Sequence, residues 1–85
     1  MKFVRVRGKF TGKLGNALRY DGSNVAAISE LVGALVIREP DGRLILPDDD
    51  GVGTVRNGDW IIKSDEYTWV VSCSDAMFHA LLEEV

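Results

Sequence analysis

Residues 54–72, TVRNGDWIIKSDEYTWVVS, place short apolar runs on either side of turn residues and include both tryptophans of the chain. These runs have the length and the β-branched and aromatic content of strands, and with their flanks they predict Val52–Arg56, Trp60–Ser64 and Thr68–Cys73. Asn57-Gly58 lies between the first two, and this dipeptide is typical of a two-residue hairpin turn because both positions accept a positive φ. Asp65-Glu66 lies between the second pair. The stretch therefore predicts two consecutive hairpins.

The N-terminal segment Lys2–Phe10 alternates apolar and basic side chains. Because side chains along a strand point to opposite faces in turn, the pattern predicts a strand with one apolar and one basic face. The apolar face comprises Val4, Val6 and Phe10, and the basic face comprises Arg5, Arg7 and Lys9. Glycines at positions 8, 12 and 15 then indicate a bend or a loose hairpin into residues 17–20.

A further hairpin is predicted in the middle of the chain, where Ala34–Arg38 and Arg43–Leu46 are joined by Glu39-Pro40-Asp41-Gly42. Proline fixes φ and glycine accepts a positive φ, so this linker has the chemistry of a turn. Residues 34–37 are apolar on both faces. We therefore expect cover on both sides of that strand, from the helices or from another subunit.

Two short helices are predicted. The first follows the turn Asp21–Asn24, where Ser23 or Asn24 supplies the cap, and ends at Gly33. Its apolar stripe is Val25, Ile28, Leu31 and Val32. The second is capped by Ser74 and has Asp75 in its first turn, where an acid favours the helix dipole. Its apolar stripe is Met77, Phe78, Leu81, Leu82 and Val85.

Together these elements predict an α+β fold in which a small, curled antiparallel sheet of about six strands carries two short helices, the second at the C-terminus. The 85 residues are predicted to form a single domain, 1–85.

No apolar run approaches the roughly 20 residues of a membrane helix, and the N-terminus does not have the pattern of a secretory signal. The lone Cys73 allows no internal disulfide and suits a reducing cytosol. Because small domains gain stability by association, a homodimer is also expected as a possibility.

Charge is unevenly distributed along the chain. Residues 1–45 contain eight basic and four acidic side chains, whereas residues 46–85 contain two basic and nine acidic ones. The candidate binding residues of the basic part are Arg5, Arg7, Lys9, Lys13 and Arg19. They suit a phosphorylated small molecule or an acidic protein partner; alternatively they form a solvated face, or one paired with the acidic half of the same chain. The sequence pI near 5.0 argues against binding to duplex nucleic acid.

Aromatic and acidic residues of the opening stretch also have two interpretations each. Trp60 and Trp69 lie on neighbouring predicted strands, where they could form a cross-strand pair in a core or interface, or a stacking platform for a base. Asp59 follows the turn glycine, a position at which a carboxylate commonly accepts hydrogen bonds from turn amides. Cys73 ends an apolar strand and is expected to be a buried, inert thiol.

Other motifs do not support catalysis, a metal or a cofactor. The segment GKFTGK at residues 8–13 is one residue shorter than a phosphate loop and is followed by Leu14 in place of Ser or Thr. Asp48-Asp49-Asp50 lacks the alternating ligands and distal Glu of a calcium loop. His79 lies four residues from Asp75 and from Glu83, which would give at most an exposed metal site. With no nucleophile elbow, we predict that the protein is not an enzyme.

The segment 54–85 resembles a small domain common in bacteriophage and prophage proteins. The resemblance rests on Gly58-Asp59-Trp60-Ile61-Ile62-Lys63, then Cys73, Phe78 and Leu82-Glu83, and extends more weakly to residues 18–33. The family has a glycine where this chain has Ser64 and Asp65, and a tyrosine where it has Leu82. The resemblance implies a phage origin and no particular activity, because the shared residues are structural.

We therefore expect a small non-enzymatic bacteriophage protein that binds a host or phage protein in the host cytoplasm, for host takeover or to counter host defence. The alternatives are a module that sequesters a phosphorylated nucleotide signal, with the basic residues on the phosphate and Trp60 or Trp69 on the base, and a minor structural component of the virion.

Overall fold

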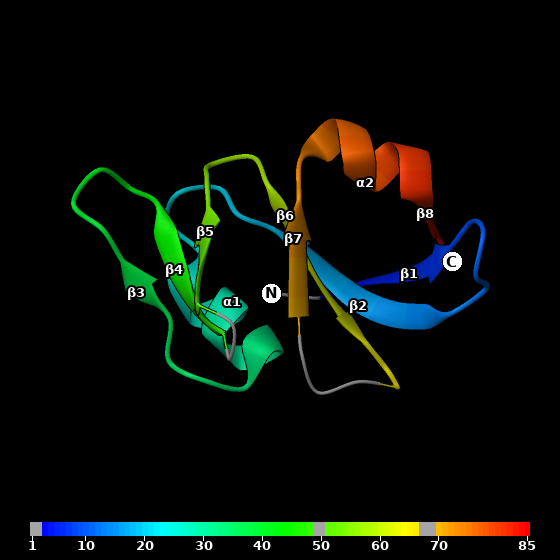
Figure 1. The fold of residues 1–85 in the computed structure, drawn as a ribbon, viewed down its shortest axis with the longest axis horizontal. Helices are drawn as coiled ribbons and strands as arrows, with labels where there is room; N and C mark the ends of the chain where they lie inside the picture. The colour runs from blue at the N-terminus through cyan, green and yellow to red at the C-terminus, as the bar shows by residue number, and fades with distance from the viewer. Residues whose placement is uncertain (1–2, 49–50, 67–69) are drawn as a thin grey trace.

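Eight strands and two helices make up the part of the chain that the computed structural model describes, residues 3–48, 51–66 and 70–85. In chain order they are β1 (Val4–Gly8), β2 (Leu14–Arg19), α1 (Val25–Val32), β3 (Ile37–Arg38), β4 (Leu44–Asp48), β5 (Gly51–Val55), β6 (Trp60–Ser64), β7 (Val70–Cys73), α2 (Asp75–Leu81) and β8 (Leu82–Glu84). The predicted α+β class with two helices is confirmed (Figure 1). The prediction of one curled sheet of about six strands is wrong, because the described strands form two open sheets.

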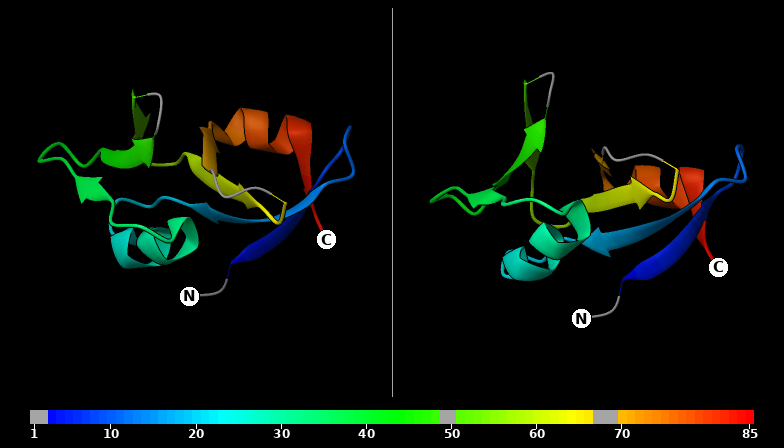
Figure 2. Two further views of the ribbon diagram at one scale, coloured as in Figure 1. Left: turned by 60° about the horizontal axis from the view of Figure 1, so that its bottom comes forward. Right: turned by 90° about the horizontal axis from the view of Figure 1, so that it is seen from below.

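The two sheets are both antiparallel. The larger one has the order β7-β6-β2-β1-β8, and the smaller one has the order β3-β4-β5. Figure 2 shows α1 and α2 on opposite sides of the larger sheet, with the smaller sheet standing beyond one end of it. The central strands β2 and β6 are thus enclosed from both sides.

Consecutive apolar residues in β2 and β6 follow from this two-sided cover. Ala17 pairs with Ile62 and Leu18 pairs with Ile61. Because neighbouring residues of a strand point to opposite faces, each strand sends one apolar side chain to each side of the sheet. Leu18 and Ile61 enter the core beside α1, and Ala17 and Ile62 enter the core beneath α2.

The larger core joins α1, the smaller sheet and one face of the larger sheet. Its buried members are Leu18, Tyr20, Ile28, Leu31, Val36, Leu44, Leu46, Val55 and Ile61. The Tyr20 side chain is fully enclosed, and its hydroxyl donates to the carbonyl oxygen of Gly42 at 2.6 Å. This hydrogen bond fixes the β3–β4 turn on the core, because a buried phenol needs a partner for its polar atom.

The smaller core is built around an aromatic stack beneath α2. The rings of Trp60 and Phe78 lie 3.8 Å apart and are inclined by only 8°. Trp60 also donates from Nε1 to Asp75 Oδ1 at 2.8 Å. The predicted cap is present, since Ser74 Oγ accepts from the amide of Met77 at 3.3 Å. These contacts attach a helix of only seven residues to the sheet, and a helix of that length would not be stable in isolation.

The Asn57-Gly58 turn does not form the predicted hairpin. β5 belongs to the smaller sheet, whereas β6 pairs with β2 and β7. Among the described residues only glycines have positive φ, so Gly58 at +95° is the single such residue in this turn. A hairpin turn of the predicted kind needs two. The amide of Gly58 instead donates to the carbonyl of Tyr20 at 2.8 Å, and the turn carries the chain from one sheet to the other.

The last apolar stripe is also only partly helical. α2 ends at Leu81, and Leu82–Glu84 forms β8 along the outer edge of β1. Backbone pairing to that edge satisfies groups of β1 that would otherwise lack partners. The predicted strand Lys2–Phe10 is likewise shorter, because it ends at Gly8 and leaves Phe10 81% exposed in the following turn.

The cap of α1 differs from the prediction as well. Neither predicted side chain caps the helix: Asn24 occupies the N-cap position but makes no capping hydrogen bond. Its Oδ1 instead accepts from the amide of Asp21, whose carboxylate accepts from the amides of Ser23 and Asn24. The predicted end of the helix is confirmed, since Gly33 adopts the left-handed conformation at φ 77°.

We expect Phe78→Ala to lower the free energy of unfolding by about 3–5 kcal/mol, because it removes the buried ring that holds α2 on Trp60. Met77→Ala is the matched control, since the neighbouring Met77 is half exposed and its loss should change stability by less than about 0.5 kcal/mol. Urea denaturation of both variants measures the difference. Equal stability losses would show that α2 does not depend on the stack.

Candidate functional site

Arg5 and Arg7 lie on the exposed face of β1, as predicted, and each contacts a carboxylate from the acidic half of the chain. Arg5 makes two hydrogen bonds with Asp65, at 2.9 and 2.8 Å, and a third to Asn16 Oδ1 at 3.0 Å. Arg7 donates to Glu83 of β8 at 2.7 and 2.9 Å. The basic strand is therefore connected on both sides to its neighbours in the sheet.

The other three predicted binding residues also contact acceptors within the chain. Lys9 donates from Nζ to the carbonyl of His79 at 2.7 Å, near the C-terminus of α2, where a cation is favoured by the helix dipole. Lys13 Nζ lies 3.5 Å from Glu66 Oε2. Arg19 donates to the Gly58 carbonyl at 3.1 Å and lies 3.9 Å from Asp75.

These contacts favour one of the interpretations of the charge asymmetry. The basic N-terminal residues and the acidic C-terminal ones meet across β1, β2 and their neighbours, so the two halves neutralise one another within the fold. The ion pairs remain about half exposed, so solvent screens their charges and each pair adds little to stability. A phosphorylated ligand at this face would have to displace existing partners.

Trp60 belongs to the smaller core, where Phe78 covers one face of its indole ring. Cys73 of β7 lies opposite Trp60 in the sheet, so that position is not taken by the predicted cross-strand tryptophan partner. Trp69 lies outside the described residues. The geometry thus assigns Trp60 to packing and leaves only part of its ring exposed.

Cys73 is partly rather than fully buried. Desolvation raises the pKa of its thiol above the ordinary value, and the negative charges of Asp59 and Asp75 raise it further. At neutral pH the thiol therefore stays protonated and weakly nucleophilic, which agrees with the expected inert role.

Asp59, Asp75 and Glu83 each contact a partner within the described part of the chain. Asp59 Oδ2 accepts from the amide of Arg56 at 3.0 Å, which confirms its predicted role in the turn. His79 lies 3.2 Å from Asp75, but Glu83 turns to Arg7. No group of three His, Cys, Asp or Glu side chains within the described residues is arranged to hold a metal ion. Asp49 and Asp50, together with the side chain of Asp48, lie outside the part of the chain that is described.

Within its described part, the outer side of the smaller sheet carries the exposed Ile37 and the partly buried Ile45. Ile37, Ile45 and Thr54 lie side by side across β3, β4 and β5, and directly paired residues share a face. Ile37 is 59% exposed and the preceding Leu35 is 83% exposed, while Val36 between them is buried. We call the surface formed by Leu35, Ile37, Ile45 and Thr54 the apolar sheet face. One of the two covers predicted for residues 34–37 is thus absent within the described chain.

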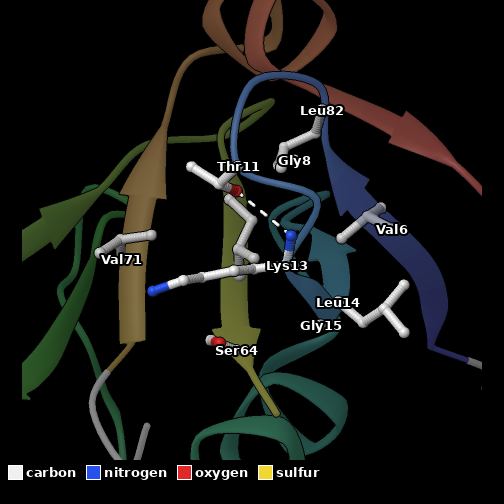
Figure 3. A pocket seen from close by; sticks show the side chains of 10 residues that line it. Val6, Gly8, Thr11, Lys13, Leu14, Gly15, Ser64, Val71 and Leu82 are labelled. Carbon is white, nitrogen blue, oxygen red and sulfur yellow. Dashed lines mark hydrogen bonds between the residues drawn. The ribbon is translucent and has the colours of Figure 1, made fainter. Parts of the chain in front are cut away.

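A second feature is an open pocket of about 420 Å³ on the α2 side of the larger sheet, which we call the sheet pocket. Val6, Gly15 and Ser64 form one cross-strand row of its floor, and Ile62 and Val71 belong to the next row. Leu82 closes one side, and Lys13, which lies just before β2, extends across β6 toward β7 (Figure 3). None of the lining residues that the structure describes comes from α2.

The two features differ in how far the sequence indicates them. The two-sided apolar pattern of residues 34–37 pointed to the apolar sheet face. The sheet pocket had no comparable signal, because its lining residues come from five strands and from the turn between β1 and β2, and they meet only once the strand order is known. Lys13 alone was already a candidate binding residue.

No protein-family model, curated protein or solved structure matches this chain. Neither helix that the structure describes has the length and apolar content needed to cross a membrane.

The Arg5–Asp65 pair gives a pH-dependent prediction. Hydrogen bonds from Arg5, assisted by its charge, hold the pKa of Asp65 below its ordinary value, while the unfolded chain protonates this group near pH 3.9. Because the folded pKa is the lower one, the contribution to stability is complete above about pH 4 and is lost as the pH falls through the folded pKa. Asp65→Asn should therefore show a smaller fall in Tm between about pH 5 and pH 2.5.

Arg5→Gln removes the cause of the lowered pKa and should flatten the same part of the Tm profile, with no further flattening in the double variant. Circular dichroism melts across the pH series measure this. Superimposable profiles for the wild type and both single variants would contradict the assignment.

Proposed function

We propose that this chain is a small, non-enzymatic bacteriophage protein that binds a host or phage protein in the cytoplasm of the infected cell, through the apolar sheet face. The observation that carries the proposal is the 59% exposure of Ile37 on a sheet whose opposite face is in the core, together with the 83% exposure of Leu35 in the segment just before β3. The phage origin is supported by the resemblance of residues 54–85 to the phage domain. Host takeover or resistance to host defence is the role that such binding would serve.

Burial of this surface supplies a clear driving force for association. A fully buried Leu or Ile side chain contributes about 1.5–3 kcal/mol relative to an exposed one. Soluble monomers seldom leave adjoining large apolar residues open without an interaction to cover them. The partner we propose therefore presents apolar side chains of its own to Leu35, Ile37 and Ile45.

The edge of the smaller sheet adds a second means of attachment. β3 is the outer strand of the order β3-β4-β5 and is only two residues long. Outer strands have backbone groups that an incoming strand can pair with, and added strands of this kind are a common mode of protein recognition. We propose that the partner contacts both this edge and the adjoining apolar sheet face.

Sequestration of a phosphorylated nucleotide is less well supported by the geometry. All five basic candidates contact carboxylate or carbonyl oxygens of the chain itself, and Trp60 is stacked on Phe78. A nucleotide would have to replace these interactions, whereas a protein on the apolar sheet face would displace only water.

Site-specific photocrosslinking tests the proposed surface. A benzophenone amino acid at position 37 should yield one discrete crosslinked protein when the tagged chain is expressed in phage-infected bacteria. The same group at position 77, which is also exposed but lies on α2, should not yield that product. Adding Leu35→Lys to the position 37 variant should reduce the yield at least about tenfold, because it places a charge in the apolar contact.

Light scattering of the purified wild type and Ile37→Lys proteins identifies the alternative occupant. A wild-type dimer that becomes a monomer in the variant would assign the surface to a second copy and overturn the hetero-partner proposal. Equal crosslinking from positions 37 and 77 would overturn it as well. Melting temperatures should agree closely, because substitution of an exposed side chain changes stability by about 0.5 kcal/mol or less.

A further inference from the structure

The sheet pocket has a structural cause that prevents the chain from filling it. Gly15 lies at the centre of its floor, between Val6 of β1 and Ser64 of β6. A Cβ atom at Gly15 would lie 2.6 Å from the carbonyl oxygen of Lys63 and 3.2 Å from the Cα of Ser64. Both are backbone atoms, so a larger residue would force β2 and β6 apart. The hollow is thus fixed by the close approach of the two central strands.

The lining combines an apolar floor and walls with few polar groups. Val71, which is 45% exposed, and the partly buried Leu82 provide the exposed apolar surface, whereas Val6 and Ile62 also line the pocket but are only 1% and 9% exposed. Such a combination, with a small number of polar groups at defined positions, is typical of small-molecule sites. The volume of about 420 Å³ lies in the usual range for them.

Lys13 is the only charged residue that lines the pocket among those described. Its ammonium reaches toward Val71 (Figure 3). Its Nζ also lies 3.5 Å from Glu66 Oε2, in an ion pair that is about half exposed. Because such a contact is weak, an anionic group entering the pocket can take the place of Glu66. Thr11 and Ser64 add hydroxyl groups to the lining. The oxygen of Thr11 accepts a hydrogen bond from the amide of Lys13, and that of Ser64 accepts one from the amide of Glu66. Each hydroxyl can also donate a hydrogen bond to a ligand.

We propose that the sheet pocket binds a small apolar molecule with one anionic group, which places its apolar body against Val71 and Leu82 and its anion at Lys13 Nζ. At about 30 Å³ for each water-sized group, the pocket volume accommodates roughly a dozen non-hydrogen atoms. A chain of about ten carbons with a carboxylate or phosphate head meets this description. The site lies on the larger sheet and is independent of the apolar sheet face.

Titration calorimetry with decanoate, decyl phosphate and decanol tests this site. The wild type should bind at least one of the anions about fivefold more tightly than decanol, because only an anion gains a charge-assisted contact. The preferred head group then distinguishes a carboxylate from a phosphate ligand. Lys13→Met retains most of the length of the side chain and should abolish the preference for the anion while leaving decanol binding unchanged.

Two further variants separate this site from other surfaces. Val71→Glu places a charge on the pocket wall at an exposed position and should weaken binding of the anion at least about tenfold. Ile37→Lys, on the apolar sheet face, should leave it unchanged. The proposal is overturned if neither anion binds saturably below about 1 mM, if Lys13→Met retains the anion preference, or if Ile37→Lys weakens binding as much as Val71→Glu does.

Discussion

The pairing of β2 with β6 is the constraint on which the rest of the structure depends. These strands occupy the centre of the larger sheet, and the pairs Ala17–Ile62 and Leu18–Ile61 deliver apolar groups to both of its faces. Two cores of different size result, one reached by α1 and the smaller sheet and the other by α2. A register shift of one residue would exchange the two sets of side chains. The two-sided burial therefore fixes the register as well as the positions of both helices.

Local patterns predicted most strands and the start of each helix, but they did not predict which strands pair. Asn57-Gly58 shows the reason. The dipeptide does form a turn, since Gly58 has a positive φ. However, the amide of Gly58 donates to the carbonyl of Tyr20, and the strand that follows pairs with β2 instead of β5. The apolar periodicity also predicted a helix through Leu82, which is wrong. Residues 82–84 instead form backbone hydrogen bonds with the outer edge of β1. Long-range hydrogen bonding decided both cases.

The candidate surfaces also differ in whether a local pattern or only the fold reveals them. The alternation of residues 2–10 placed Arg5 and Arg7 correctly on one face of β1, whereas the predicted third member, Lys9, lies beyond the end of the strand. Only the fold shows that Asp65 and Glu83 are the partners of the two arginines. The double-sided apolar pattern of residues 34–37 indicated a surface in need of cover, which is a local property. The sheet pocket depends on the small residue Gly15 lying between Val6 of β1 and Ser64 of β6 in its floor. The sheet pocket therefore cannot be predicted from the pattern of any single segment.

The pairing of β1 with β8 has a consequence for the order of folding. Val6 lies opposite Glu84, so the two strands that close this side of the sheet are separated by nearly the whole chain. During synthesis the hairpin of β1 and β2 can form early, but the outer edge of β1 gains its neighbour only after residues 82–84 have left the ribosome. Contacts between such distant segments slow folding, because a large loop must be ordered before the contact forms. The newly made chain thus passes through a period in which β1 is an open edge, available to other chains.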